Sequence, residues 1–447
     1  MPIAMKIGAL KNLISNIASV GRQAFGGKPH HGGDIGDMCK RLLEIRGEAS
    51  AVSLAEAIIE SYAALDDEER LEFFRVLLED FLPDAVILED AIEIYQANPT
   101  PDAHMRLVKA ADSPRQTLFR AINMAPAGTA AIVSMREDLN RMLRQHPQLL
   151  PVDSDIVYLL RLWFNRGFLC IERIDWHTPA AILEKLIAYE AVHEIKGWDD
   201  LRRRLASDRR FFAFFHPALP DEPLVFVEVA LMQGLTGSID SVLQQDQPNE
   251  DNCGTPDTAI FYSISNCQPG LKGVSFGDFL IKHVTDELAA ELPDVKTFST
   301  LSPIPGFMRW LDVALKEEAV DLPLTDWGRT QLERLSAPGW HLDEAAAAVL
   351  EPVLLTLCAH YFLRVKKHAE PVDPVARFHL RNGARLERIN WLGDCSVKGI
   401  RQSAGMLVNY VYDPVSVTQN HEAYVNDGEV ISSATVQQLF RARVAAA

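Results

Sequence analysis

The sequence predicts an α+β protein, in which an N-terminal all-helical bundle over residues 36–205 precedes an α/β domain over residues 206–447. Three observations support this prediction. Apolar residues recur at helical spacing through most of the first range. Near Arg209 the chain becomes rich in aromatic and β-branched residues and in proline turns, which is typical of strands. A strand, a glycine-containing loop, a helix and a further strand then follow in that order, as in an α/β or α+β domain.

The helical half follows a flexible, glycine-rich joint at residues 26–36. Ser53 and Glu56 predict a capping box before "LAEAIIESYAAL", and Asp66 with Asp67 predicts the start of the next helix. Three later stretches have the same periodicity: "DAVILEDAIEIYQA", "SDIVYLLRLWFNRGFL" and "TPAAILEKLIAYEAVHEI". Because this half contains no catalytic constellation, we expect it to be a packing or oligomerisation module.

The second half alternates strands and helices. "RRFFAFFHPALPDEPLVFVEVALM" (Arg209–Met232) predicts two strands, and "TAIFYSIS" (Thr258–Ser265) predicts a third. A helix follows near Ser275, and a strand is expected around "KTFSTLS" (Lys296–Ser302). Helices are then expected near residues 306–316, 325–336 and 343–365.

Composition limits the possible partners. The formal net charge of −17 argues against nucleic acid or an anionic membrane as the main partner, because phosphate backbones require a basic surface. No apolar stretch approaches the roughly 18 residues of a transmembrane helix. The six cysteines contain no CxxC pair, and the histidines lack metal-ligand spacing. We therefore expect reduced thiols and no metal site.

The first 35 residues form a separate arm in this interpretation. It carries Lys6, Lys11, Arg22 and Lys28 and no acidic residue before Asp34. A floppy or helical arm on a cytoplasmic protein is our expectation. A mitochondrial transit peptide, and hence a location in the matrix, is the alternative.

A candidate phosphate-binding loop lies in "FYSISNCQPGLKGVSFGDFLIKHV" (Phe261–Val284), which changes from strand to helix across Pro269, Gly270 and Gly273. Glycine lets the backbone approach a ligand closely and adopt positive φ. The N-terminal amides of the following helix would attract an anion, and Lys272 would add a positive charge. A strand-to-helix connection without a ligand is the alternative.

Two later segments carry candidate catalytic side chains. "FSTLSPIPGFMRWL" places Ser299, Thr300 and Ser302 at the end of a strand, although hydroxyls that only satisfy the backbone are the alternative. "ARFHLRNGARLERINWLGDCSVKGIRQSAGMLVNYVYD" mixes many polar groups with apolar ones, which predicts a lined pocket. His379 in this segment is the candidate general acid or base, and a satisfied core histidine is the alternative.

These segments, together with the two strands from Arg209, closely resemble the malonyl-CoA decarboxylases, in the same order across residues 209–412. The resemblance implies a catalytic domain of the GCN5-related acetyltransferase fold after the helical domain. It implies Ser299 and His379 as catalytic residues, with Tyr412 near them. It also implies a coenzyme A loop made of Pro269, Gly270, Leu271, Lys272, Gly273, Val274 and Ser275.

The resemblance implies an enzyme that decarboxylates malonyl-CoA to acetyl-CoA and CO₂. It also implies that the enzyme is a homotetramer and acts in malonyl-CoA and fatty-acid metabolism. Neither a metal nor an organic cofactor is needed, because the thioester itself accepts the electrons as an enolate. Two other functions stay open: an acyl-CoA-dependent acyltransferase of the same fold, and a non-catalytic CoA-binding sensor.

Overall fold

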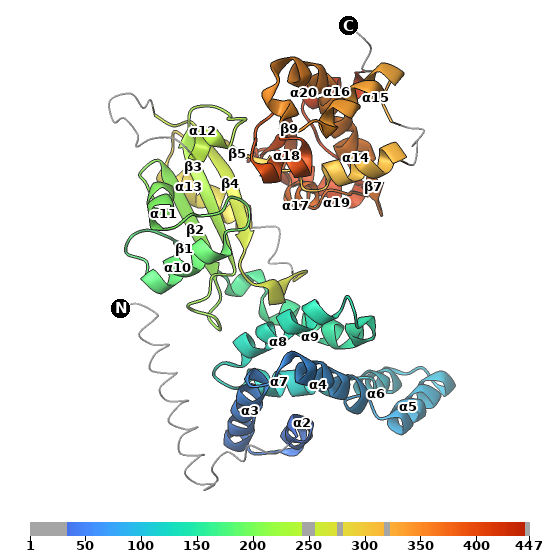
Figure 1. Ribbon diagram of the computed structural model, residues 1–447. Helices are drawn as coiled ribbons and strands as arrows, with labels where there is room; N and C mark the ends of the chain where they lie inside the picture. Colours follow the sequence, from blue (N-terminus) through green and yellow to red (C-terminus); the bar gives the residue numbers. More distant parts are fainter. Residues whose placement is uncertain (1–33, 244–254, 275–279, 317–321, 443–447) are drawn as a thin grey trace. The chain divides into compact units, whose positions relative to one another are not determined.

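The computed structural model describes residues 34–243, 255–274, 280–316 and 322–442 of the 447-residue chain (Figure 1). The described residues form two compact units. The first consists of the chain up to Cys170, His216–Glu222 and the described part of Gln268–Phe276. The second consists of Ile171–Phe215, Pro223–Cys267 and the described chain beyond Gly277.

The first unit is helical, as predicted. Its α-helices are α2 (Ile35–Glu44), α3 (Glu48–Ala63), α4 (Asp67–Asp80), α5 (Ala85–Ala97), α6 (Pro101–Ala110), α7 (Pro114–Asn123), α8 (Gly128–Met142) and α9 (Leu150–Trp163). Short 3₁₀ turns η1 (Pro147–Leu149) and η2 (Arg166–Phe168) lie on either side of α9. The core is apolar and includes Phe73 and Phe74 of α4, Phe119 of α7, Ile132 of α8 and Leu159 of α9.

One of the two predicted helix starts is confirmed in this unit. Asp66 accepts hydrogen bonds from the amides of Glu68 and Glu69, and the Glu69 carboxylate accepts one from the Asp66 amide, which is a full capping box. The predicted cap at Ser53 is wrong, because α3 already begins at Glu48. The intervening residues EASAV contain no helix breaker, so the helix extends toward the N-terminus past Ser53.

The second unit is built on an eight-stranded sheet in the order β1-β2-β3-β4-β5-β10-β6, with β9 paired to β10. Its strands are β1 (Cys170–Arg173), β2 (Arg209–Phe215), β3 (Val225–Met232), β4 (Thr258–Asn266), β5 (Thr297–Thr300), β6 (Ser302–Pro303), β9 (Arg385–Asn390) and β10 (Leu407–Val411). The predicted strands from Arg209 to Met232 and from Thr258 are confirmed. Strands β4 and β5 are parallel, whereas β2–β3, β3–β4, β5–β10 and β9–β10 are antiparallel. A parallel pair needs a crossover, and the chain between β4 and β5 includes η3 (Pro269–Leu271) and α13 (Leu280–Glu291).

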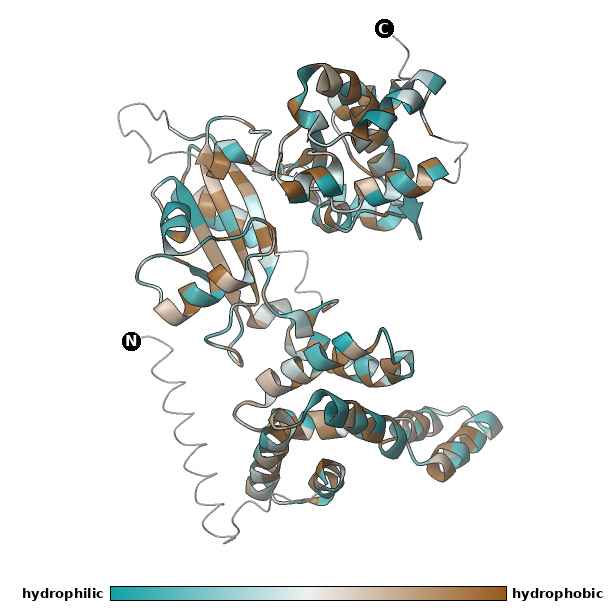
Figure 2. Ribbon diagram, viewed as in Figure 1, coloured by the Kyte–Doolittle hydropathy of each residue, from teal (hydrophilic) through white to brown (hydrophobic). Residues whose placement is uncertain are grey.

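Two apolar clusters pack against this sheet. Alternate residues of β2, Phe211, Ala213 and Phe215, pack with residues of α10 (Ala180–Tyr189) and α11 (Trp198–Arg204). A second cluster joins Ile260 of β4 to Val242 of α12 (Asp240–Leu243) and to Leu407 of β10. Figure 2 shows the hydrophobic colouring that runs along these central strands.

The C-terminal part of the second unit is mostly helical. It contains α14 (Phe307–Lys316), α15 (Asp326–Leu332), η4 (Glu333–Ser336), η5 (Trp340–Leu342), α16 (Glu344–Arg364), α17 (Pro374–Arg381), α18 (Val397–Ser403), α19 (Val417–Asp427) and α20 (Ala434–Arg441), with a small hairpin of β7 (Lys366–Lys367) and β8 (Glu370–Pro371). The three predicted helices near residues 306–316, 325–336 and 343–365 are confirmed. By length and composition α16 could cross a membrane, but 61% of its apolar window is buried in the protein, as in a core helix.

The two compact units divide the chain at Cys170, whereas the sequence analysis placed the boundary near residue 205. Helices α10 and α11 lie before that predicted boundary, yet their apolar residues pack on β2. The stretch is also not wholly helical, since β1 joins the sheet. The predicted arm over residues 1–35 lies outside the described residues, apart from Asp34 and Ile35, the N-cap and first residue of α2.

Candidate active site

His379 lies near the end of α17 and is almost completely buried. Asp373 starts this helix by accepting hydrogen bonds from the amides of Val375 and Ala376. Both ring nitrogens of His379 have a partner. Nδ1 lies 2.7 Å from the Tyr412 hydroxyl, and Nε2 lies 3.0 Å from Ser302 Oγ.

The hydroxyl of Ser302 connects the imidazole to the end of β5. It donates to Thr300 Oγ1 at 2.9 Å, and Thr300 Oγ1 also accepts the backbone amide of Tyr410 at 3.2 Å. Because Ser302 donates to Thr300, its oxygen is free to accept from His379. The hydrogen bonds are thus satisfied by a neutral imidazole that carries its proton on Nε2 and accepts from Tyr412 at Nδ1.

Two tyrosines contact the same histidine: Tyr410 belongs to β10, and Tyr412 directly follows the strand. They are two residues apart in extended chain, so their side chains leave the same face. The Tyr410 ring stacks on the imidazole with 4.6 Å between centroids and 27° between planes. The register of β10 places Ser302 opposite Val408 and Ser299 opposite Val411.

Burial controls the protonation of this group. Loss of water lowers the pKa of His379 to about 3, so its imidazole is neutral near pH 7. The same burial raises the pKa values of Tyr410 and Tyr412 well above their usual range, so both phenols stay protonated. The site therefore consists of neutral hydrogen-bonding groups that are largely shielded from water.

The structure brings Ser302, rather than Ser299, to the histidine. Ser299 is fully buried, and its hydroxyl donates to the backbone carbonyl of Thr300 at 3.2 Å. The family resemblance implies Ser299 as the catalytic serine. Ser299, Thr300 and Ser302 lie within four positions of the chain. Which of them reaches His379 depends on the pairing of β10 with β5 and β6, and the local sequence does not reveal that pairing.

The predicted CoA loop is described as far as Val274, and Ser275 lies outside the described residues. Gly270 is buried because its backbone packs on α8, where an added Cβ would lie 2.0 Å from the carbonyl oxygen of Val133. Arg136 of α8 donates to the Gly270 carbonyl at 2.6 Å. Gly273 has φ of +77°, so it uses the conformational freedom of glycine, and no atom of the described residues lies within 4 Å of its Cβ position.

Both parts of the chain match known domains. Residues 167–447 match the family model for the malonyl-CoA decarboxylase C-terminal domain, and residues 81–164 match that for the malonyl-CoA decarboxylase N-terminal domain. The chain belongs to the malonyl-CoA decarboxylase family. The prediction made from the resemblance is confirmed at this level.

Relatives within the malonyl-CoA decarboxylase family cover most of the chain. The goose enzyme (Anser anser anser), described as mitochondrial malonyl-CoA decarboxylase, is 34% identical over 397 residues, which cover 82% of this chain and 79% of the relative. The crystal structure of malonyl-CoA decarboxylase from Rhodopseudomonas palustris is 48% identical, covers 90% of this chain and 98% of its own, and has a TM-score of 0.86. That from Agrobacterium vitis is also 48% identical, covers 92% and 100%, and has the same TM-score. The predicted α+β class, a helical region followed by a mixed sheet domain, is confirmed.

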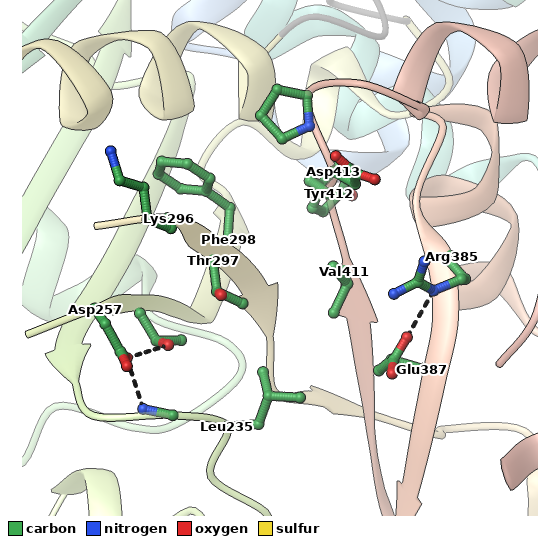
Figure 3. Close-up of a pocket in the computed structure, with 13 residues that line it drawn as sticks. Leu235, Asp257, Lys296, Thr297, Phe298, Arg385, Glu387, Val411, Tyr412 and Asp413 are labelled. Atoms are coloured by element: carbon green, nitrogen blue, oxygen red, sulfur yellow. Dashed lines mark hydrogen bonds and ion pairs between the residues drawn. The ribbon is translucent and has the colours of Figure 1, made fainter. Parts of the chain in front are cut away.

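A cavity of about 360 Å³ adjoins this site in the second unit, where β10 ends and β5 begins (Figure 3). Several of its polar residues are paired with one another: Arg385 Nε donates to Glu387 at 2.7 Å, and Asp257 accepts from the amide of Gly234 at 2.8 Å. Tyr412, which bonds His379, is part of its lining. The complete lining is Gly234, Leu235, Asp257, Thr258, Lys296, Thr297, Phe298, Arg385, Glu387, Val411, Tyr412, Asp413 and Pro414.

Proposed function

We propose that this chain decarboxylates malonyl-CoA to acetyl-CoA and CO₂ at Ser302 and His379, with Tyr412 as the partner of the imidazole. The observation that carries the proposal is the buried hydrogen-bond chain from Thr300 through Ser302 and His379 to Tyr412. Membership of the malonyl-CoA decarboxylase family supports the reaction. Ser299 is replaced by Ser302 in our assignment of the catalytic serine.

The reaction requires stabilisation of an enolate. When CO₂ leaves, the electron pair of the broken carbon–carbon bond stays on C2 and is delocalised onto the thioester oxygen. A hydrogen-bond donor aimed at such an oxygen is worth on the order of 10²–10³ in rate. A neutral imidazole is an established donor to a developing enolate, and the burial that keeps His379 neutral fits this role.

In this proposal the Ser302 hydroxyl hydrogen-bonds the malonyl carboxylate or the thioester oxygen. His379 provides the proton that C2 takes up, directly or through a water molecule, and solvent replaces it. No acyl-serine intermediate is needed, because the thioester bond is not broken. We also propose that neither a metal nor an organic cofactor takes part, since the thioester accepts the electron pair.

The loop from Pro269 to Ser275 is proposed to bind the pyrophosphate of coenzyme A. Support comes from the positive φ of Gly273 and from the exposed Lys272 beside it. Gly270 has a different purpose in the described structure, because its missing side chain allows the loop to pack on α8.

The wider context is also a proposal. We expect the protein to be a homotetramer and to act in malonyl-CoA and fatty-acid metabolism. Cytoplasmic location stays our prediction. The matrix is the alternative, and the goose and rat relatives are described as mitochondrial.

One assay tests the reaction and the serine together. Purified protein is incubated with malonyl-CoA without an acyl acceptor, and acetyl-CoA is followed by mass. We expect acetyl-CoA to form, and Ser302→Ala and His379→Asn each to lower kcat about 100-fold or more. The matched control is Ser299→Ala, which removes a buried hydroxyl three residues before Ser302. It should change kcat by less than about threefold, because no transition-state contact is lost.

Three results would contradict parts of this proposal. Failure to form acetyl-CoA unless an amine acceptor is present would favour the acyltransferase. Binding of coenzyme A without turnover of any acyl-CoA would favour the sensor. A large loss of kcat in Ser299→Ala, with normal kcat in Ser302→Ala, would return the serine role to Ser299.

A further inference from the structure

Three buried polar atoms near the Ser302–His379 pair make no hydrogen bond of normal length and angle among the described residues. They are the hydroxyls of Tyr361 and Tyr410 and the Oδ2 oxygen of Asp373. All three residues are at most 1% exposed. Native structures contain few such atoms, and each one calls for an explanation in terms of strain, a catalytic role or bound water.

Two of these atoms converge on Gly306. A Cβ built on Gly306 would lie 2.4 Å from the Tyr361 hydroxyl and 3.6 Å from Asp373 Oδ2. A side chain at this position would therefore displace the tyrosine hydroxyl. The absence of one allows the backbone of Gly306 to lie directly against both groups.

Gly306 and Asp373 belong to the two segments that carry the proposed catalytic pair. Gly306 lies four residues after Ser302, in the turn between β6 and α14. Asp373 is the N-cap of α17, which carries His379. Tyr361 comes from α16, the long buried helix, so a third element fixes the place where these two segments meet.

The electrostatics of the cluster agree with this arrangement. Burial is the main cause that raises the pKa values of Tyr361 and Tyr410, and the negative charge of Asp373 raises both further. Burial also raises the pKa of Asp373, while the backbone amides of Ala376, Val375 and Gly306 oppose that rise. The carboxylate of Asp373 thus interacts with the turn after Ser302, with its own helix and with both phenols.

We propose that Asp373 and Tyr361 are positioning residues that hold Ser302 and His379 at hydrogen-bonding distance by enclosing Gly306. Asp373 Oδ1 starts the helix of His379, and Oδ2 faces the turn that follows Ser302. The Tyr361 hydroxyl lies beside Oδ2 at the position that a side chain of residue 306 would occupy. This inference rests on the proposed function, because it assigns a purpose to the geometry of that site.

The test uses two conservative variants of the full-length protein. Tyr361→Phe keeps the ring and removes only the hydroxyl, and Asp373→Asn keeps the cap through Oδ1 while it removes the charge. We expect each to lower kcat for malonyl-CoA about tenfold or more with KM changed less than twofold, because small misplacements of reacting groups are costly in the transition state. In ¹⁵N spectra of histidine-labelled protein, the His379 signals, assigned by their loss in His379→Asn, should shift in both variants.

The matched control is Tyr62→Phe. Tyr62 is a buried tyrosine of the helical unit that donates to Asp138 at 2.9 Å. It should lower the melting temperature and leave both kcat and the His379 signals unchanged. If Asp373→Asn does not fold, Tyr361→Phe alone carries the test.

The outcomes separate this inference from the proposed function. Wild-type kcat and unshifted His379 signals in Tyr361→Phe would overturn the positioning role, even where Ser302→Ala and His379→Asn are inactive. Active Ser302→Ala and His379→Asn would instead overturn the proposed site. In that case the His379 signals alone decide whether Tyr361 and Asp373 hold the imidazole.

Discussion

At the scale of single residues, burial rather than a neighbouring charge determines the state of His379. An exposed histidine has a pKa near 6.5 and changes charge around neutral pH. His379 is surrounded by Ser302, Tyr410 and Tyr412, which are all neutral, so loss of water is the cause of its pKa of about 3. The imidazole is therefore a permanent hydrogen-bonding group across the physiological range.

This state predicts the pH dependence of the reaction. The profile of kcat/KM reports the pKa values of the free enzyme. Because His379 is already neutral well below pH 5, its titration should not change kcat/KM between pH 5 and 8. The wild-type and His379→Asn profiles should therefore have the same shape over this range. Steady-state kinetics over this range measure it, and a limb with a pKa near 6.5 that belongs to His379 would contradict the assignment.

At the scale of elements, the predicted CoA loop depends on α8 for its shape. Arg136 is buried in the first unit, where its Nε donates to Asp153 at 2.8 Å and its Nη1 donates to the carbonyl of Gly270 at 2.6 Å. A buried arginine paired on both sides is costly to disrupt. The helical unit thus contributes directly to the conformation of a loop that we assign to coenzyme A.

We predict that Arg136→Met raises KM for malonyl-CoA about tenfold with a smaller effect on kcat, because the loop loses its anchor before the substrate binds. Arg115→Met is the matched control, since Arg115 is equally buried in the same unit and pairs with Asp155 at 2.7 Å. Both variants should lower stability, but only Arg136→Met should raise KM. Equal KM values in the two variants would separate the loop from substrate binding.

At the scale of the whole molecule, the helical unit exposes apolar side chains that a monomer would leave in water. Val86 of α5 is 76% exposed, and Met105 of α6 is 63% exposed. A contiguous exposed apolar patch is a common mark of an interface, and α5 and α6 pack against each other. The predicted tetramer would be a reason for their exposure.

Light scattering at micromolar concentration should give a mass four times the 49.8 kDa of the chain. We expect Val86→Lys to lower that mass, because a charge placed in an apolar interface opposes association. A wild-type mass of 49.8 kDa would contradict the prediction of a tetramer.

The buried imidazole also makes the stability of the second unit depend on pH. In the unfolded chain His379 takes up a proton below about pH 6.5, whereas the folded pKa is about 3. The unfolded state therefore binds more protons between these values, and stability falls as the pH drops through this window. On going from pH 8 to pH 5 this one group should cost on the order of 2 kcal/mol.

Thermal unfolding of the wild type and of His379→Asn at both pH values measures this cost. The fall in Tm on acidification should be smaller in the variant, which has no imidazole to protonate. An equal fall in both proteins would show that His379 contributes nothing to acid sensitivity.

The sequence by itself determined those features that depend on neighbours along the chain. Asp66 starts helix α4 as predicted, because a cap needs only the next two or three amides. The aromatic and β-branched run from Arg209 and the strand from Thr258 are likewise local patterns. The motifs beyond Arg209 also carried enough information to identify the family.

Only the tertiary structure decided which groups meet. Ser299 and Ser302 have the same chemistry, and the pairing of β10 across β5 and β6 determines that Ser302 reaches His379. Gly270 lies in a segment whose composition suggests a ligand loop. A Cβ built on it would nevertheless lie closest to the backbone of Val133 in α8. Helices α10 and α11 look like the end of the bundle in the sequence, but they pack on the sheet. In each case the deciding contact joins residues that lie far apart in the chain, and such contacts cannot be inferred from local sequence periodicity.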